Sequence, residues 1–160
     1  MRSSQIVILA ISTTALVACN PFRREPVTEV TRDANVNARW QASLVTPAAL
    51  VGAVQIKGSA TMQPAKNNEN TLFSLNINNA TPGGLHPWQV HRGQCGADEG
   101  VVGSAEMYQA IKVGDEGRGK ASATLPMTTP TSGSYFVTVG ASAANAETVV
   151  ACGNLAPPTS

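Results

Sequence analysis

The sequence predicts an all-β domain, and three observations support this. Short stretches in which apolar and polar residues alternate recur along most of the chain, as in strands with one buried face. Turn-forming residues separate these stretches, including 14 Gly and 10 Pro. Strong helical periodicity is absent, and only 13% of the residues are charged. Seven or eight short antiparallel strands at this spacing favour a Greek-key β-sandwich or flattened barrel.

The first strands show the clearest alternation. It begins near Arg39, and in residues 40–44 Trp, Ala and Leu alternate with polar neighbours. Residues 54–62 repeat the pattern with Val, Ile, Gly, Ala and Met. After a polar loop at 64–70, residues 73–78 alternate Phe, Leu and Ile with Ser and Asn. Each of these three stretches is therefore predicted to be a strand with one buried face.

The later strands follow from weaker signals. Residues 107–113 and 120–125 are expected to pair, because the glycine-rich connection 114–119 is typical of a hairpin. Periodicity leaves open whether residues 104–111 begin as a helical turn instead. The remaining expected strands are residues 88–91, 134–139 and 148–155.

The amino terminus predicts export. Met1-Arg2 precedes an apolar run at residues 6–17, which is typical of a secretory signal peptide and too short to span a bilayer comfortably. Leu16-Val17-Ala18-Cys19 resembles a bacterial lipobox, so we expect residues 1–18 to be removed and Cys19 to be lipidated. Acyl chains on Cys19 would anchor the protein in a lipid membrane. The alternative is an ordinary signal peptide, with Cys19 as a buried or incidental thiol.

These features predict the domain organisation and the location. Residues 19–38 are expected to be the lipidated cysteine and a flexible tether, residues 39–155 the β-domain and residues 156–160 a disordered tail. Many lipoproteins that stay in the inner membrane have an aspartate after the lipidated cysteine, whereas this chain has Asn20. We therefore expect the protein to be located in the bacterial cell envelope, on the outer membrane and facing the periplasm. The net charge of +1 predicts no nucleic-acid partner.

Cysteine usage agrees with export. The chain has three cysteines, and lipidation of Cys19 would leave Cys95 and Cys152. In an oxidising compartment we expect these two to form a disulfide.

The segment 82–95, P-G-G-L-H-P-W-Q-V-H-R-G-Q-C, concentrates the residues that can bind a metal. Alternation in a strand would place Gln89 and His91 on one face and Trp88 on the other, where we expect it in the core. The segment resembles the copper-binding strand of the copper/zinc superoxide dismutases, whose pattern is G-L-H-G-F-H-V-H followed closely by a cysteine. Gly84-Leu85-His86 and Val90-His91 match that pattern.

The carboxyl end carries a second part of this resemblance. Residues 145–153, N-A-E-T-V-V-A-C-G, are similar to the family's N-A-G-S-R-L-A-C-G. Together the two segments imply a superoxide dismutase-like fold over most of residues 39–155. The resemblance also implies the Cys95–Cys152 disulfide, because these positions match the two cysteines of the bacterial-type pattern.

The resemblance further implies that both metal sites are lost. The family binds copper through four histidines, of which only His91 is matched; Gln89 and Val139 stand at two of the others. The loop that carries the bridging histidine and the zinc ligands is short here and contains no histidine. Val149 stands where the family has the arginine that guides superoxide to copper. His86 matches a structural histidine that bonds to neighbouring backbone.

Two functional hypotheses follow. The first is a non-catalytic binding or structural module of the cell envelope, without a cofactor and with an unidentified protein or small molecule as its partner. The alternative is a superoxide dismutase-related enzyme or a copper carrier, in which His91 and His86, with a methionine, hold copper weakly. The single matched ligand favours the first hypothesis, because imidazoles suit both oxidation states of copper and an amide or a valine does not replace them.

Overall fold

The computed structural model describes residues 39–53, 55–66 and 68–158. All of them belong to one of the two units into which the chain divides, residues 32–160. The expected signal peptide, the lipidated Cys19 and the tether lie outside the described residues. Within those residues, no helix is both long enough and apolar enough to cross a membrane.

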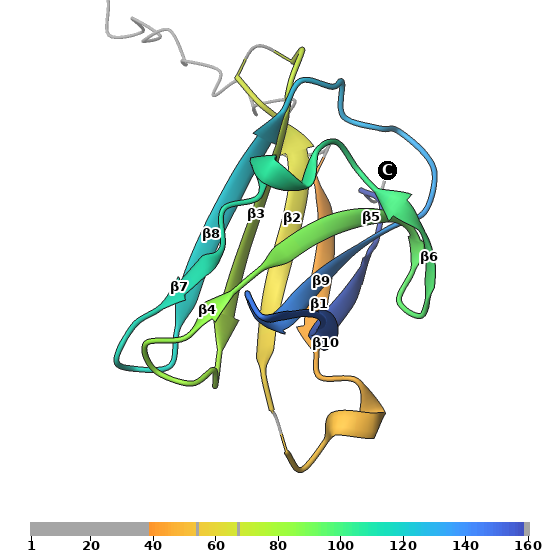
Figure 1. Ribbon diagram of the computed structural model, residues 1–160. Coiled ribbons are helices and arrows are strands. Elements are labelled where there is room, and N and C mark those ends of the chain that lie inside the picture. Colours follow the sequence, from red (N-terminus) through yellow and green to blue (C-terminus); the bar gives the residue numbers. More distant parts are fainter. Residues whose placement is uncertain (1–38, 54, 67, 159–160) are drawn as a thin grey trace, which may run out of the picture. The chain divides into compact units, whose positions relative to one another are not determined.

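The described part of the chain folds as one strongly curled antiparallel sheet with no α-helix (Figure 1). This confirms the predicted all-β class, with ten strands where seven or eight were expected. Two short 3-10 turns, η2 (Ala48–Leu50) and η3 (Ala105–Met107), accompany the strands. The order across the sheet is β4-β7-β8-β3-β2-β1-β10-β9-β5-β6. The strands are β1 (Trp40–Val45), β2 (Lys57–Pro64), β3 (Thr71–Asn78), β4 (Leu85–His86), β5 (Trp88–Gln94), β6 (Ala97–Val101), β7 (Ile111–Val113), β8 (Gly119–Leu125), β9 (Tyr135–Ser142) and β10 (Asn145–Leu155).

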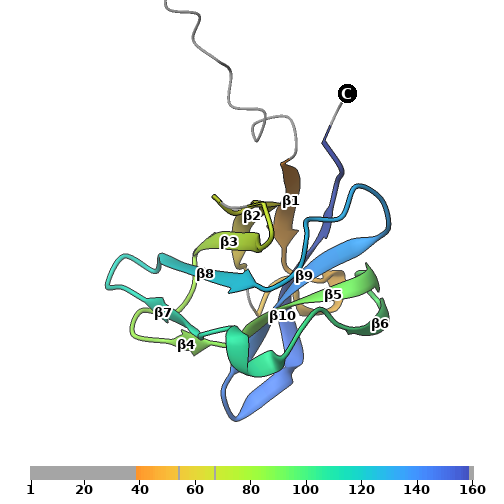
Figure 2. The same cartoon turned by 90° about the horizontal axis from the view of Figure 1, so that it is seen from above.

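One short segment of chain connects the two ends of the curled sheet. β4 and β5 are separated only by Pro87, yet β4 pairs with β7 and β5 pairs with β9. Proline has no N–H to donate to a ladder, so it suits the point where one pairing ends and the other begins. The Pro87 carbonyl accepts a hydrogen bond of 2.8 Å from the N–H of Gly140 in β9. Seen from above, β4 and β7 lie on one side of the interior and β5 and β6 on the other (Figure 2).

The interior is filled by the side chains that the alternation predicted. In β1, Trp40, Ala42 and Leu44 are buried and the residues between them are exposed. In β3, Phe73, Leu75 and Ile77 are buried in the same way. Because successive side chains of a strand point to opposite faces, each buried row requires an outward row beside it. The largest fully buried side chains include Trp40, Phe73, Leu44, Met62, Ile77, Ile111 and Leu125.

Two aromatic residues pack together at the β5 side of the core. Trp88 is buried and donates its indole N–H to the carbonyl of Gln109 at 2.8 Å, which confirms its predicted place. Its ring meets Tyr108 edge-to-face, with centroids 4.9 Å apart. The Tyr108 hydroxyl donates to the buried carbonyl of Val102 at 2.6 Å. Burial raises the pKa of Tyr108 to about 12, while the backbone of Val90 acts in the opposite direction.

Several strand boundaries differ from the prediction. β2 begins at Lys57 rather than at residue 54. The strand expected at residues 107–113 is only Ile111–Val113, because Ala105–Met107 forms a 3-10 turn. The helical turn named as the alternative for this region was therefore the better prediction.

Two strands and one paired residue were not expected. β4 is two residues long, and β6 is exposed along most of its length, so neither shows the alternation that marks a strand. Ala156, placed in the expected disordered tail, exchanges two backbone hydrogen bonds with Gln41, at 2.8 and 3.1 Å. Ala156 is therefore held beside β1 by backbone pairing.

Candidate functional site

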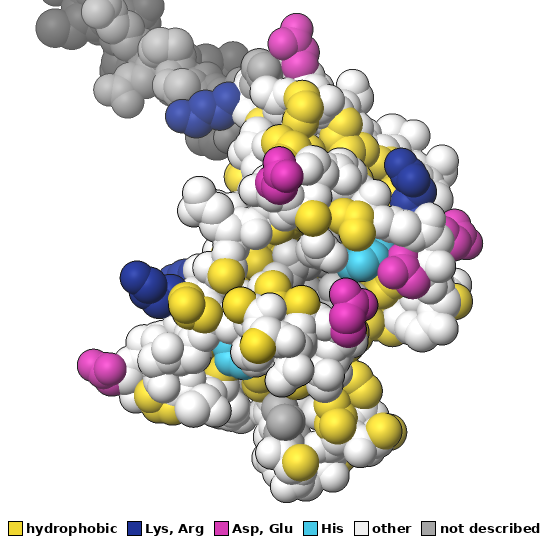
Figure 3. All heavy atoms as spheres, in the orientation of Figure 1, with side chains coloured by type: hydrophobic (Ala, Val, Ile, Leu, Met, Phe, Trp, Pro, Cys, Tyr) yellow, Lys and Arg dark blue, Asp and Glu magenta, His cyan; other side chains and the backbone are white. Residues whose placement is uncertain are grey.

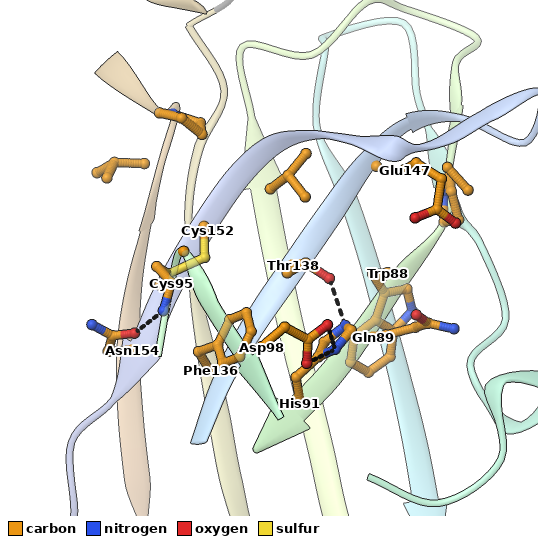
Figure 4. A pocket seen from close by; sticks show the side chains of 18 of the residues that line it. Trp88, Gln89, His91, Cys95, Asp98, Phe136, Thr138, Glu147, Cys152 and Asn154 are labelled. Atoms are coloured by element: carbon orange, nitrogen blue, oxygen red, sulfur yellow. Dashed lines mark hydrogen bonds and ion pairs between the residues drawn. A yellow bond between two sulfur atoms is a disulfide. The ribbon is translucent and has the colours of Figure 1, made fainter. Parts of the chain in front are cut away.

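A hollow of about 880 Å³, here called the outer pocket, lies on the outward face of the sheet (Figure 4). Its walls come mainly from β5, β9 and β10, with Val45 of β1 and Pro47 at one edge. The strand residues that line it alternate with core residues: Thr138 of β9 faces the pocket, whereas Val137 and Val139 are buried inside. A concave site of this volume is in the range that holds small molecules.

His91 lies in the wall of the outer pocket with both ring nitrogens engaged. Nδ1 is 3.0 Å from both carboxylate oxygens of Asp98, and Nε2 is 3.1 Å from the Thr138 hydroxyl oxygen. The ring stacks on Phe136 with a centroid distance of 5.0 Å. Because a carboxylate only accepts, Nδ1–H donates to Asp98, and in the neutral ring Nε2 accepts from Thr138. The imidazole is therefore buried, oriented and hydrogen-bonded on both sides.

Asp98 is held in place by the backbone as well as by His91. Its Oδ1 accepts a hydrogen bond of 2.7 Å from the N–H of Gly100. This bond and, more weakly, the contact with His91 lower the pKa of Asp98, with slight burial opposing them. The carboxylate is therefore ionised at neutral pH, and 54% of the side chain stays exposed at the pocket rim.

Val139, which the resemblance places at a ligand position, does not face the outer pocket. In the register of β5 and β9, Gln89 lies opposite Thr138, and Trp88 lies opposite Val139. Val139 has no exposed surface and points into the core, on the other face of the sheet from Gln89 and His91. The residue of β9 that meets His91 is therefore Thr138. Thr138 and Val139 point to opposite faces because successive side chains of a strand alternate.

Val149 and Gln89 both line the outer pocket. Val149 is half-buried and adds an apolar group to the wall. Among the described residues that line the pocket there is no Lys or Arg, whereas Asp98 and Glu147 are both present. The pocket is therefore a site of negative charge rather than one that attracts an anion.

His86 lies away from the outer pocket network. It is buried on the same face as Trp88 and Val90, and its Nδ1 is 2.9 Å from the carbonyl oxygen of Gly140. His91 is paired with Phe136, four residues from Gly140 along β9, which corresponds to roughly 13 Å of strand. Space-filling atoms show the two histidines of the chain, in cyan, at separate places (Figure 3). The structure does not bring His86 and His91 together as ligands of one ion.

The contact of His86 with the Gly140 carbonyl is the kind of backbone bond that the family resemblance implied for this position. The other ring nitrogen, Nε2, is buried without a hydrogen-bond partner among the described residues. A side chain at Gly140 would put its Cβ 2.6 Å from the carbonyl oxygen of Ala146, so glycine is needed where β9 passes this neighbour. His86 thus fastens β4 to β9 at a close approach of the backbone.

Asp98, His91 and Thr138 stand in the order carboxylate, imidazole and hydroxyl that nucleophilic hydrolases use. Thr138, however, lies within β9 and is paired on both sides, opposite Gln89 and Cys152. Its backbone N–H is held in the sheet and cannot turn toward a developing oxyanion. We interpret the three side chains as a network that orients His91.

The disulfide Cys95–Cys152 is present and forms part of the pocket wall. Its Cα atoms are 6.1 Å apart, and it joins the turn after β5 to β10. The N–H of Cys95 also donates to the side-chain oxygen of Asn154 at 2.8 Å. The predicted pairing of the two cysteines is confirmed.

The described residues contain no group of three or more His, Cys, Asp or Glu side chains placed to hold one metal ion. His91 and Asp98 form a pair, but each already serves the other as a hydrogen-bond partner. In comparisons with protein-family models and with curated proteins, the chain matches none.

Sequence reasoning did not single out Asp98, Thr138 or Glu147. A signal for Asp98 was available, because a tight turn at Cys95-Gly96 folds the following residues back beside β5 and His91. Thr138 carried no such signal, since its neighbour on β5 depends on pairing between segments almost fifty residues apart. Glu147 belongs to the exposed start of β10 and reaches the pocket only through the course of that strand.

Proposed function

We propose that this chain is an envelope lipoprotein whose superoxide dismutase-like domain has lost its copper and zinc sites and serves as a non-catalytic binding module. The observation that carries the proposal is that both ring nitrogens of His91 already have hydrogen-bond partners. The one residue that matches a copper ligand has both nitrogens engaged by Asp98 and Thr138, in the wall of a pocket large enough for a small molecule. A transition metal at Nε2 would have to displace Thr138 and would gain one imidazole.

The finer fold assignment is part of this proposal. A Greek-key flattened barrel of the superoxide dismutase type is supported by the single segment that pairs with both ends of the sheet. It is also supported by the disulfide between the two cysteines that match the family pattern. A disulfide is typical of proteins outside the reducing cytoplasm, which agrees with export to the envelope.

The metal sites provide the main test. Protein purified from its native envelope is expected to hold neither copper nor zinc at stoichiometric level, measured by elemental mass spectrometry after exposure to a competing chelator. His91→Ala should give the same result as the wild type, because His91 alone cannot form a tight site. A wild-type protein that keeps one copper, which His91→Ala loses, would contradict the proposal and favour the copper carrier.

Two double variants serve as matched controls for the geometry. Gln89→His with Thr138→His places two new imidazoles on the face of His91 and is expected to gain copper affinity. Gln89→His with Val139→His buries one imidazole in the core and is expected to lose stability by roughly 1–3 kcal/mol with a smaller gain in affinity. Equal copper binding by the two variants would show that the assignment of faces is wrong.

The anchor provides a separate test. With Cys19 lipidated, the wild-type protein is expected to partition into detergent, and Cys19→Ala should stall processing or release the protein from the membrane fraction. Cell fractionation followed by intact-mass measurement distinguishes these results. A wild-type protein that is soluble in the periplasm and cleaved at another position would show that there is no lipid anchor.

A further inference from the structure

The walls of the outer pocket are largely apolar, although it lies on the solvent face of the sheet. Val45 is 56% exposed at its edge, and Pro47, Pro87 and Val149 add further apolar surface. The disulfide forms part of the wall (Figure 4). Apolar surface in a concave site loses contact with water when an apolar ligand enters, which favours binding.

The charges at the outer pocket have one sign. Figure 4 shows Glu147 toward one end of the pocket, and Asp98, beside His91, between Glu147 and the disulfide. Asp98 keeps more than half of its side chain exposed, even though it accepts hydrogen bonds from His91 and Gly100. Among the described lining residues there is no Lys or Arg to neutralise either carboxylate. A ligand with a positive charge would therefore be attracted by the field of two carboxylates.

The polar groups of the pocket wall suit a ligand that donates hydrogen bonds. Gln89 lies opposite Thr138 on the pocket face and is half-buried there, with an amide that can accept and donate. Since carboxylates only accept, the exposed oxygens of Asp98 and Glu147 are complementary to an ammonium or amidinium group. The apolar walls are complementary to a hydrocarbon or aromatic body attached to such a group.

We propose that the outer pocket binds a small organic cation, with a primary ammonium or amidinium group attracted by the carboxylates of Asp98 and Glu147 and an apolar body against the apolar part of the wall, to which Val149 belongs. This inference rests on the proposed binding function and names the class of its ligand. It requires no metal and no chemical step. The cation replaces part of the hydration of two carboxylates that have no Lys or Arg beside them within the described pocket lining.

The direct test compares three probes of nearly equal shape: naphthylmethylammonium, naphthylmethanol and naphthoate. Binding to the mature wild-type protein is measured by calorimetry at low and at physiological salt. We expect saturable binding of the ammonium compound, weaker binding of the alcohol and none of the carboxylate. Salt should weaken the binding of the ammonium compound most, because salt screens the charges of the partly exposed carboxylates.

Variants locate the site. Asp98→Asn and Glu147→Gln are each expected to lower the affinity for the ammonium probe roughly three- to ten-fold, as for partly exposed ion pairs. Glu116→Gln is the matched control, since Glu116 is exposed in the connection between β7 and β8 and is paired with Arg118 at 3.3 Å. Val149→Arg adds a cation to the pocket wall and should reverse the preference, so that naphthoate binds better than the ammonium probe.

Equal binding of the alcohol and the ammonium compound, or unchanged binding in both carboxylate variants, would overturn the choice of a cation. Absence of binding by all three probes would overturn the pocket as a site for this class of ligand. None of these results bears on the loss of the metal sites, which the metal measurement tests separately. Because Asp98→Asn also alters the partner of His91, Glu147→Gln is the decisive variant.

Discussion

Loss of the Cys95–Cys152 disulfide is expected to destabilise the domain by about 4 kcal/mol. The bond links residues 57 positions apart, and closure of a loop of this length removes much of the conformational freedom of the unfolded chain. It also holds the turn after β5, whose Cys95 N–H bonds to Asn154, against β10. Reduction therefore raises the conformational entropy of the unfolded chain. It also removes a covalent link from one wall of the outer pocket.

The measurement is denaturant or thermal unfolding of the Cys95→Ala/Cys152→Ala variant beside the wild type. A loss of this size corresponds to a drop of roughly 10–20 °C in Tm for a domain of this length. Cys19→Ala, which keeps the disulfide, is the control, and its β-domain should unfold like that of the wild type. Free thiols in freshly isolated protein, or an unchanged Tm after reduction, would contradict this prediction.

Raising the pH from 10 to 12 is expected to destabilise the domain by roughly 2 kcal/mol through Tyr108 alone. Burial raises the pKa of this tyrosine from 10.0 to about 12. Above pH 10 the unfolded chain releases the phenol proton while the folded chain keeps it, so the unfolded state gains stability. The contribution of Tyr108 is therefore complete below pH 10 and is lost as the pH rises through about 12.

Tyr108→Phe isolates this effect from the other groups that titrate at high pH. The difference in unfolding free energy between wild type and variant should fall steadily over this interval, since only the wild type carries the phenol. The difference in near-ultraviolet absorbance between the two folded proteins should show one tyrosinate appearing near pH 12. A constant stability difference, or ionisation of Tyr108 near pH 10, would show that the hydroxyl is not buried against Val102.

Local alternation predicted much of the fold. Trp40, Leu44, Phe73 and Ile77 were assigned to buried faces from their spacing alone, and all four are buried. That inference succeeds because a period of two is a property of the extended backbone and needs no knowledge of the neighbouring strand. β4 could not be found in this way, because two residues carry no period and its partner β7 lies more than twenty residues further along the chain.

The candidate site was predicted less completely. The match to a known pattern grouped His91, Gln89 and Val149, and all three line the outer pocket. Val139 was placed at the same site and lies in the core. The residue types along the chain do not reveal the register of β9 against β5. A shift of the register by one residue would move every side chain to the opposite face.

The sequence by itself determined the all-β class, the buried faces of the first strands and the two cysteines that could pair. The class follows from the composition, the buried faces from the two-residue alternation, and the cysteine pair from the number of cysteines. None of these three observations depends on how the strands pack. Only the tertiary structure decided that Thr138 and Asp98 engage His91, that His86 lies elsewhere and that Asp98 and Glu147 share one apolar pocket. These relations depend on strand pairing between distant segments and on the curl of the sheet, which bring together residues that no local pattern connects.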